Sequence, residues 1–260
     1  MSTKLLKEWA HLSLAQRSMK LEQMFGVKVC GELLAHYYKR NGINYIKPQY
    51  AYLRKQAQRE ELTTQQQEAS LELAQHISQG QQIVYVDESS FHQWLVPSRA
   101  WVRRDTVLDM PSSRGSSVTI IGAISERAGL VHYKIVSGNN NAQEFKVFVQ
   151  ELVQKVRGDA LVYMDNYTVH HSKVVKDFFN DRIQQRFFPP YSCALNPIEK
   201  LWMLVKGRWK RLMLERPDAM TEEEMVRELS EIIESFKDQC RGLANCHYQH
   251  IVRSLRGVFV

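Results

Sequence analysis

The sequence lacks both a long hydrophobic run and a paired-cysteine motif. No apolar stretch approaches the ~18 residues that a membrane-spanning helix needs, and the first one is broken by Lys7 and Glu8. We therefore expect neither a membrane span nor a signal peptide. The four cysteines lie in three separate regions and form no Cys-x-x-Cys pair, which is typical of reduced thiols and not of a disulfide framework. These absences predict an intracellular protein with no membrane partner.

The overall composition removes several further classes of protein. Of the 260 residues, 44% are hydrophobic, 24% are charged and 10% are aromatic, which is ordinary globular usage. Disordered, collagen-like and coiled-coil chains have different compositions. The chain can therefore bury a substantial hydrophobic core.

The positive charge is concentrated at the N-terminus. The formal net charge is +7, and residues 1–60 carry eleven basic side chains against four acidic ones. The other 200 residues hold 24 of each sign. A basic segment attached to a charge-balanced body indicates that the segment has a polyanionic partner.

Two short helices around a glycine predict a helix-turn-helix unit over residues 1–46. Apolar residues recur at helical spacing from Leu14 to Phe25, Gly26 interrupts them, and a second helical pattern runs from about Cys30 to Arg40. The second helix can face base edges and phosphates with its polar and basic groups, although such a helix is also often a solvated surface. The side chains expected to contact DNA here and in the following linker are Lys28, His36, Lys39, Arg40, Lys47, Arg54 and Lys55.

A change of periodicity near Gly80 divides the rest of the chain. Residues 47–80 read as a basic linker followed by a Gln-rich helix from Thr63 to about Gln79. Beyond them, residues 81–260 show strand and helix patterns in alternation. The strands are expected at 83–86, 118–124, 130–136, 161–165 and 185–188, and the helices at 141–156, at 170–180 and from Asn196-Pro197 onward. This order predicts an α/β domain of the ribonuclease H-like kind, a mixed five-stranded sheet flanked by helices.

Three carboxylates stand where this fold brings elements together. Asp87 ends the first strand, Asp165 ends the fourth, and Glu199 lies in the helix that opens at Asn196-Pro197. If the two strands are neighbours, the three side chains converge at one edge of the sheet. Hard oxygen ligands with open positions are what two Mg²⁺ ions need, and Mn²⁺ is expected to substitute. The chemistry would be metal-assisted phosphodiester cleavage and transfer.

Each carboxylate also has a purely structural interpretation. Asp87 can simply end a strand, and Asp165-Asn166 is a common turn pair. Asn196 can be an N-cap with Pro197 as the first helical residue, which puts Glu199 in a capping-box position. The spacing alone leaves these alternatives open.

The surrounding motifs resemble those of the mariner-superfamily transposases and their bacterial insertion-sequence relatives. The matching segments are residues 86–91, the region of Trp101, residues 121–124, 164–166 with His170, 189–192 and 195–202. The resemblance extends over nearly the whole chain, and Cys193-Ala194 departs from the family's pattern. The 33 residues between Asp165 and Glu199 are close to that superfamily's spacing of about thirty-four. The resemblance implies a ribonuclease H-like domain with an Asp-Asp-Glu triad at Asp87, Asp165 and Glu199. It also implies Mg²⁺ dependence, cleavage at transposon ends, and strand transfer into a TA dinucleotide of target DNA.

Other residues are expected close to this centre. His170 can lie beside the metals or the scissile phosphate, or be structural, and Asn166 can orient the second aspartate or a metal-bound water. The helix after Glu199 has a core stripe on one face and a basic face suited to a phosphate backbone. The basic residues expected to contact DNA there are Lys200, Lys206 and Lys210. A further helix is expected to start at Thr221, with Glu224 completing its cap.

The resemblance leaves rival functions open. Only ~50 residues precede the linker, enough for one of the two helix-turn-helix units usual in the superfamily, so we expect a shortened DNA-binding region. The expected partners are double-stranded DNA, as transposon ends and target, and a second copy of the chain. The protein is expected to lie with the genome, in a nucleus or a bacterial cytoplasm. The alternatives are a ribonuclease H or junction-resolving nuclease of the same fold, and a catalytically silent DNA-binding protein.

Overall fold

A computed structural model describes residues 8–9, 12–43, 56–96, 116–216 and 219–260 of the chain. The chain forms two compact units, Met1–Leu53 and Arg54–Val260, which are described separately. Lys47, Arg54 and Lys55, three of the predicted DNA contacts, lie outside the described residues.

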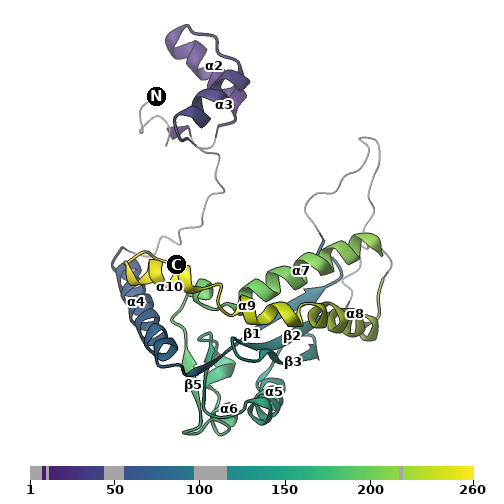
Figure 1. Cartoon of the computed structure of the whole chain (residues 1–260). Coiled ribbons are helices and arrows are strands. Elements are labelled where there is room, and N and C mark those ends of the chain that lie inside the picture. Colours follow the sequence, from purple (N-terminus) through teal and green to yellow (C-terminus); the bar gives the residue numbers. More distant parts are fainter. Residues whose placement is uncertain (1–7, 10–11, 44–55, 97–115, 217–218) are drawn as a thin grey trace. The chain divides into compact units, whose positions relative to one another are not determined.

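The first unit contains the two predicted helices, α2 (Leu14–Phe25) and α3 (Gly31–Arg40) (Figure 1). Ser13 caps α2 in a capping box with Gln16, and Gly26 ends the helix in the left-handed conformation at φ 68°. Helix α3 buries Leu34 and Tyr38 and keeps most of its polar side chains exposed. The helical part of the N-terminal prediction is confirmed.

The second unit is built on a five-stranded sheet in the order β3-β2-β1-β4-β5 (Figure 1). The pairs β3-β2 and β2-β1 are antiparallel, whereas β1-β4 and β4-β5 are parallel. The mixed sheet of the predicted ribonuclease H-like fold is confirmed. Its strands are β1 (Gln82–His92), β2 (Ser117–Ser125), β3 (Gly129–Ser137), β4 (Ala160–Met164) and β5 (Ile183–Phe187).

Two apolar layers cover the two faces of this sheet. Alternate residues of β1 join different layers: Ile83 and Tyr85 pack with α7, whereas Val84 and Val86 pack with α5. The period of two along a strand produces this division. Figure 1 shows α7, α8 and α9 on one side of the sheet and α5 and α6 on the other. The helices of this unit are α4 (Gln56–Ser78), α5 (Ala142–Lys155), α6 (Lys173–Lys176), α7 (Ile198–Glu215), α8 (Glu222–Ser235), α9 (Cys240–Leu243) and α10 (Tyr248–Leu255).

The predicted helix at 170–180 is wrong. The chain instead makes a 3₁₀ turn (Thr168–His171) and the single-turn helix α6. The backbone carbonyl of His170 accepts a hydrogen bond from Gln185 Nε2 of β5 at 2.9 Å. That carbonyl is therefore engaged by a side chain from another element, and no continuous helix forms.

Smaller differences concern where elements begin. Helix α4 starts at Gln56 and not at Thr63, and β5 starts at Ile183. The predicted cap of α8 is confirmed, because Thr221 and Glu224 form the reciprocal pair of a capping box. The four cysteines are free, and no helix within the described ranges has the length and apolar character to cross a bilayer.

Candidate active site

The parallel pair β1-β4 brings Asp87 and Asp165 to the same level of the sheet. Tyr85 is paired with Tyr163 in the register, and Asp87 and Asp165 each follow two residues later. Asp165 is the first residue beyond β4, whereas Asp87 lies in the middle of β1, so the prediction that Asp87 ends its strand is wrong. The neighbouring strands predicted from the sequence therefore carry these two acids side by side.

Asp87 faces the layer that contains α7. Its Oδ2 accepts a hydrogen bond from Trp202 Nε1 at 3.1 Å. Gly122 lies opposite Asp87 on β2, and a Cβ at that position would stand 2.7 Å from Cη2 of Trp202. The absence of a side chain at Gly122 thus leaves room for the indole that holds Asp87.

Glu199 is the second residue of α7, and the start of that helix is tied to β1. Asn196 Nδ2 donates to the backbone carbonyl of Val86 at 3.1 Å. The structural alternative, in which Asn196 is the N-cap and Glu199 completes a capping box, does not hold, because Pro197 occupies the cap position and no side chain caps the helix. Asn196 is nevertheless close to the site, since Val86 immediately precedes Asp87.

The pKa values of these acids show that they interact. Burial raises the pKa of Asp87 well above its usual range, and the charges of Glu199, Glu88 and Asp165 raise it further. Burial also raises the pKa of Glu199; Lys206 opposes that shift and Asp165 adds to it. Carboxylates that destabilise one another's charge in this way are a fitting environment for a cation. The donor set is hard oxygen, which suits Mg²⁺ and Mn²⁺.

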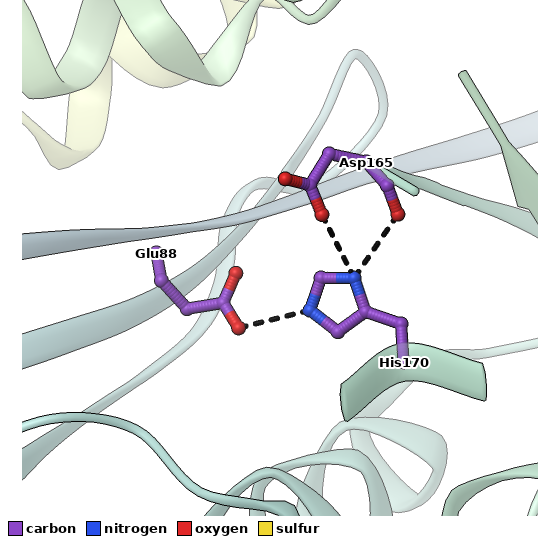
Figure 2. Close-up of side chains that lie close together, drawn as sticks. All are labelled: Glu88, Asp165 and His170. Atoms are coloured by element: carbon purple, nitrogen blue, oxygen red, sulfur yellow. Dashed lines mark hydrogen bonds and ion pairs between the residues drawn. The ribbon is translucent and has the colours of Figure 1, made fainter. Parts of the chain in front are cut away.

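Asp165 has a second neighbour, the buried imidazole of His170. Figure 2 shows the ring between two carboxylates: Nδ1 lies 2.9 Å from Asp165 Oδ1, and Nε2 lies 2.9 Å from Glu88 Oε1. Burial lowers the pKa of His170, but the hydrogen bonds to Asp165 and Glu88 outweigh it and raise the pKa to about 10. Burial would raise the pKa of Asp165, but the bond to His170 and its charge bring it below the usual value. The ring is therefore held on both sides by carboxylates.

Glu88, Asp165 and His170 also form a group whose ligand atoms lie within 4.8 Å of one another, the one such group in the described ranges. Both ring nitrogens of His170 are engaged by carboxylates, so an ion could bind the ring only by displacing one of those carboxylates. Asp87 and Glu199 offer oxygens without that obstacle. Asp87, Asp165 and Glu199 do not form a group this close in the described ranges, but their charges act on one another and their carboxylate oxygens are donors that a divalent ion prefers.

Glu88 is the residue of this site that sequence reasoning missed. It directly follows Asp87, and alternation along β1 sends it to the opposite face of the sheet. Asn140 Nδ2 donates to its Oε1 at 2.7 Å. An acid directly after the aspartate that follows an apolar run was the available signal, but its partner His170 lies 82 residues away in sequence.

The remaining predicted residues lie after β4, on α7 and in the first unit. Asn166 contacts His171 through its side-chain oxygen. Lys206 lies within electrostatic reach of Glu199, and its Nζ stands 5.9 Å from the centre of the Phe91 ring. Lys200 and Lys210 are half-buried on the same helix. The predicted DNA contacts of the first unit are all exposed: Lys28, His36, Lys39 and Arg40.

Comparison with solved structures shows the same fold in mariner transposases. A Mos1 transposase paired-end complex with the left transposon end superposes with a TM-score of 0.70 at 15% identity, covering 99% of this chain and 78% of that one. Mos1 paired-end complexes solved with Mn and with Mg give TM-scores of 0.66 and 0.63 at 17% and 16% identity. They cover 97% and 98% of this chain and 76% and 74% of theirs. At sequence identities this low, the comparison shows only that the folds are similar.

Comparison of the amino-acid sequence with known protein families identifies the family of this chain. No match is found among curated protein sequences. The profile of the DDE superfamily endonucleases, however, matches residues 82–221, a span that contains Asp87, Glu88, Asp165, His170 and Glu199. The chain belongs to the DDE superfamily of endonucleases, and its ribonuclease H-like domain is similar in fold to that of the Mos1 mariner transposase.

Proposed function

We propose that the chain is a DNA transposase that cleaves phosphodiester bonds at transposon ends and transfers strands into target DNA, at a TA dinucleotide. Asp87, Asp165 and Glu199 are its catalytic and metal-binding residues. The observation that carries the proposal is the placement of Asp87 and Asp165 at one level of the parallel β1-β4 pair, with Glu199 on the helix that Asn196 ties to β1. The raised pKa values of Asp87 and Glu199 agree with a site for cations, and the family is one of endonucleases.

The proposed cofactor is a pair of Mg²⁺ ions, for which Mn²⁺ would substitute. When bound, two divalent ions supply Lewis-acid activation of a water or a 3′-hydroxyl and neutralise charge on the phosphate. Support comes from the oxygen donors of Asp87, Asp165 and Glu199 and from the related structures solved with Mn and with Mg.

The protein's own residues would hold these ligands and the DNA in place. Trp202 fixes one oxygen of Asp87 by its indole N–H. Asn196 anchors the start of α7 to β1, which keeps Glu199 near Asp87. Lys206, close enough to oppose the pKa shift of Glu199, would contact a phosphate of a strand lying along α7.

We assign the other regions to DNA binding and assembly. Residues 1–46 would form a helix-turn-helix unit, residues 47–80 a linker and helix, and residues 81–260 the catalytic domain with its C-terminal helices. The exposed basic groups Lys28, Lys39 and Arg40, with His36, support DNA contacts by the first unit. A homodimer would hold two transposon ends together, as the paired-end Mos1 complexes suggest, and the protein would act where the genome is.

A cleavage assay with end-labelled duplexes tests this function. The duplexes are taken from the DNA flanking the coding sequence and are compared with an RNA–DNA hybrid under single turnover in Mg²⁺ or Mn²⁺. We expect cutting of the DNA duplex, and a loss of at least about 10³-fold in rate for Asp87→Asn, Asp165→Asn and Glu199→Gln, because each removes a ligand charge.

The matched control for these variants is Asp181→Asn, which neutralises an exposed acid in the turn before β5. It should cut as fast as the unaltered chain. Cleavage of the hybrid alone would contradict the transposase proposal in favour of a ribonuclease H. Equal rates in the three triad variants and the unaltered chain would contradict the assignment of the catalytic residues.

A further inference from the structure

We propose that Glu88 and His170 are positioning residues that hold the Asp165 carboxylate in its metal-binding orientation from the opposite side of the sheet. The inference rests on the proposed function, because it takes Asp165 to be a metal ligand. Glu88 and His170 themselves would not touch the ion.

Several interactions fix the imidazole of His170. Its Nδ1 approaches both Oδ1 and the backbone carbonyl oxygen of Asp165, at 2.9 and 3.1 Å, and its Nε2 is 2.9 Å from Glu88 Oε1 (Figure 2). The side chain is completely buried, and Phe145 of α5 packs against it with ring centres 4.3 Å apart. The ring therefore has a single orientation, and that orientation determines where Asp165 Oδ1 lies.

The anchor behind the ring comes from a different strand. Glu88 is held by Asn140 at 2.7 Å and belongs to β1, whereas Asp165 follows β4. The chain Glu88–His170–Asp165 therefore ties the middle of β1 to the residue that follows β4. The side chain of Asp87 points to the other face of the sheet, toward Trp202. Glu88 and His170 can therefore hold Asp165 without filling the space between Asp87, Asp165 and Glu199.

Asp165 needs such support because it is the most open of the bridged residues. Its side chain is 57% exposed, against 14% for Glu88 and 0% for His170. Besides His170, the backbone N–H of Tyr167 donates to Oδ1 at 3.2 Å. Both hydrogen bonds use Oδ1, which leaves Oδ2 to meet an ion. Without the imidazole, the carboxylate would lose its main constraint and adopt other rotamers, and an ion would have to order it on binding.

Metal affinity measured on the full chain tests this role. Mn²⁺ alone is the probe, followed by isothermal titration and by the electron paramagnetic resonance signal of free Mn²⁺. Loss of a residue that orients a metal ligand typically lowers affinity by about 10–100-fold. We expect dissociation constants raised by that factor in Glu88→Gln and in His170→Gln, each checked for folding by circular dichroism.

The chain offers a matched control in a second histidine–glutamate pair. His132 is 8% exposed, lies 2.8 Å from Glu151 and stacks on Phe148 of the same helix α5. Glu151→Gln removes the same kind of charge from the same layer without touching Asp165. Its Mn²⁺ affinity should equal that of the unaltered chain.

A double-mutant cycle separates positioning from a general loss of structure. In an Asp165→Asn background, adding His170→Gln should weaken Mn²⁺ binding no further, because the imidazole acts through the carboxylate. A full additional loss of affinity in that background would overturn the inference. So would a ¹⁴N coupling from His170 in the electron spin echo modulation of bound Mn²⁺, which would make the histidine a direct ligand.

The two proposals fail in distinguishable ways. If Asp87→Asn, Asp165→Asn and Glu199→Gln all bind Mn²⁺ normally, the proposed function is wrong and the inference is refuted with it. If those three variants bind weakly while Glu88→Gln and His170→Gln bind normally, the inference alone is wrong.

Discussion

Replacing Gly122 with alanine tests whether the packing behind Asp87 sets the position of that carboxylate. A Cβ at Gly122 would stand 2.7 Å from Cη2 and 3.1 Å from Cζ2 of Trp202. Carbon atoms that touch normally lie about 3.5–4.0 Å apart, so the indole would have to shift by roughly 1 Å. Trp202 is only 2% exposed and is surrounded by core residues, so this shift disturbs its neighbours.

We expect Gly122→Ala to lower the free energy of unfolding by about 1–3 kcal/mol, the usual cost of overpacking a core. The shift also disturbs the 3.1 Å bond from Trp202 Nε1 to Asp87 Oδ2, so Mn²⁺ affinity should fall together with stability. Urea unfolding followed by circular dichroism measures the first quantity, and Mn²⁺ titration of the folded protein measures the second.

Two further variants control for effects of alanine in general. Gly207 lies in α7 with no atom within 4 Å of its added Cβ, so Gly207→Ala should stabilise the protein by up to about 1 kcal/mol. Trp202→Phe removes the ring atoms that clash, so the combination with Gly122→Ala should cost less than the sum of the single changes. A Gly122→Ala protein as stable as the unaltered chain, with the same Mn²⁺ affinity, would refute the reasoning.

Two other predictions concern stability in acid and DNA binding. Burial lowers the pKa of His247 to about 4, against 6.5 for an ordinary histidine, so the unfolded chain takes up a proton at this residue first as the pH falls. The contribution of His247 to the free energy of unfolding is therefore fully present above about pH 6.5 and is lost as the pH falls from 6.5 to 4. At pH 5 the loss is about 2 kcal/mol. Chemical unfolding at pH 7 and pH 5 should show that loss, and His247→Gln should show a smaller one; equal losses would contradict the assignment. Lys39 and Arg40 are exposed at the end of α3, so replacing both with alanine should reduce the slope of log affinity against log salt by about 1 for each phosphate that is no longer neutralised. Fluorescence anisotropy with a labelled duplex measures the slope, and an unchanged slope would show that the two side chains do not bind phosphate.

Local patterns were enough to locate the strands along the sequence. Asp87 and Asp165 follow apolar strand runs, and a parallel β1-β4 pair places them at one level. The core stripe of α7 was equally predictable, because helical spacing alone selects residues such as Leu201, Trp202 and Trp209, which are all buried.

Interactions between distant segments account for the failures. Asn196 has the right type and place for an N-cap, but the carbonyl of Val86 engages its amide instead. Residues 170–180 have a helical pattern, but His170 is held on both sides by Glu88 and Asp165, and Gln185 engages its carbonyl. No spacing rule links positions 88 and 170, so the hydrogen bond between Glu88 and His170 emerges only in three dimensions.

Because the side chains of Asp87 and Glu88 point to opposite faces of the sheet, the acid site depends on whether the number of residues in β1 ahead of Asp87 changes by an odd or an even number. Inserting or deleting one residue in this strand ahead of Asp87 would exchange the two faces, turning Glu88 toward Trp202 and Asp87 toward His170. Each acid would then meet the other's partner. Related chains can therefore vary freely in the length of the turns around β1, but within the strand their alignments should show gaps of two residues or none.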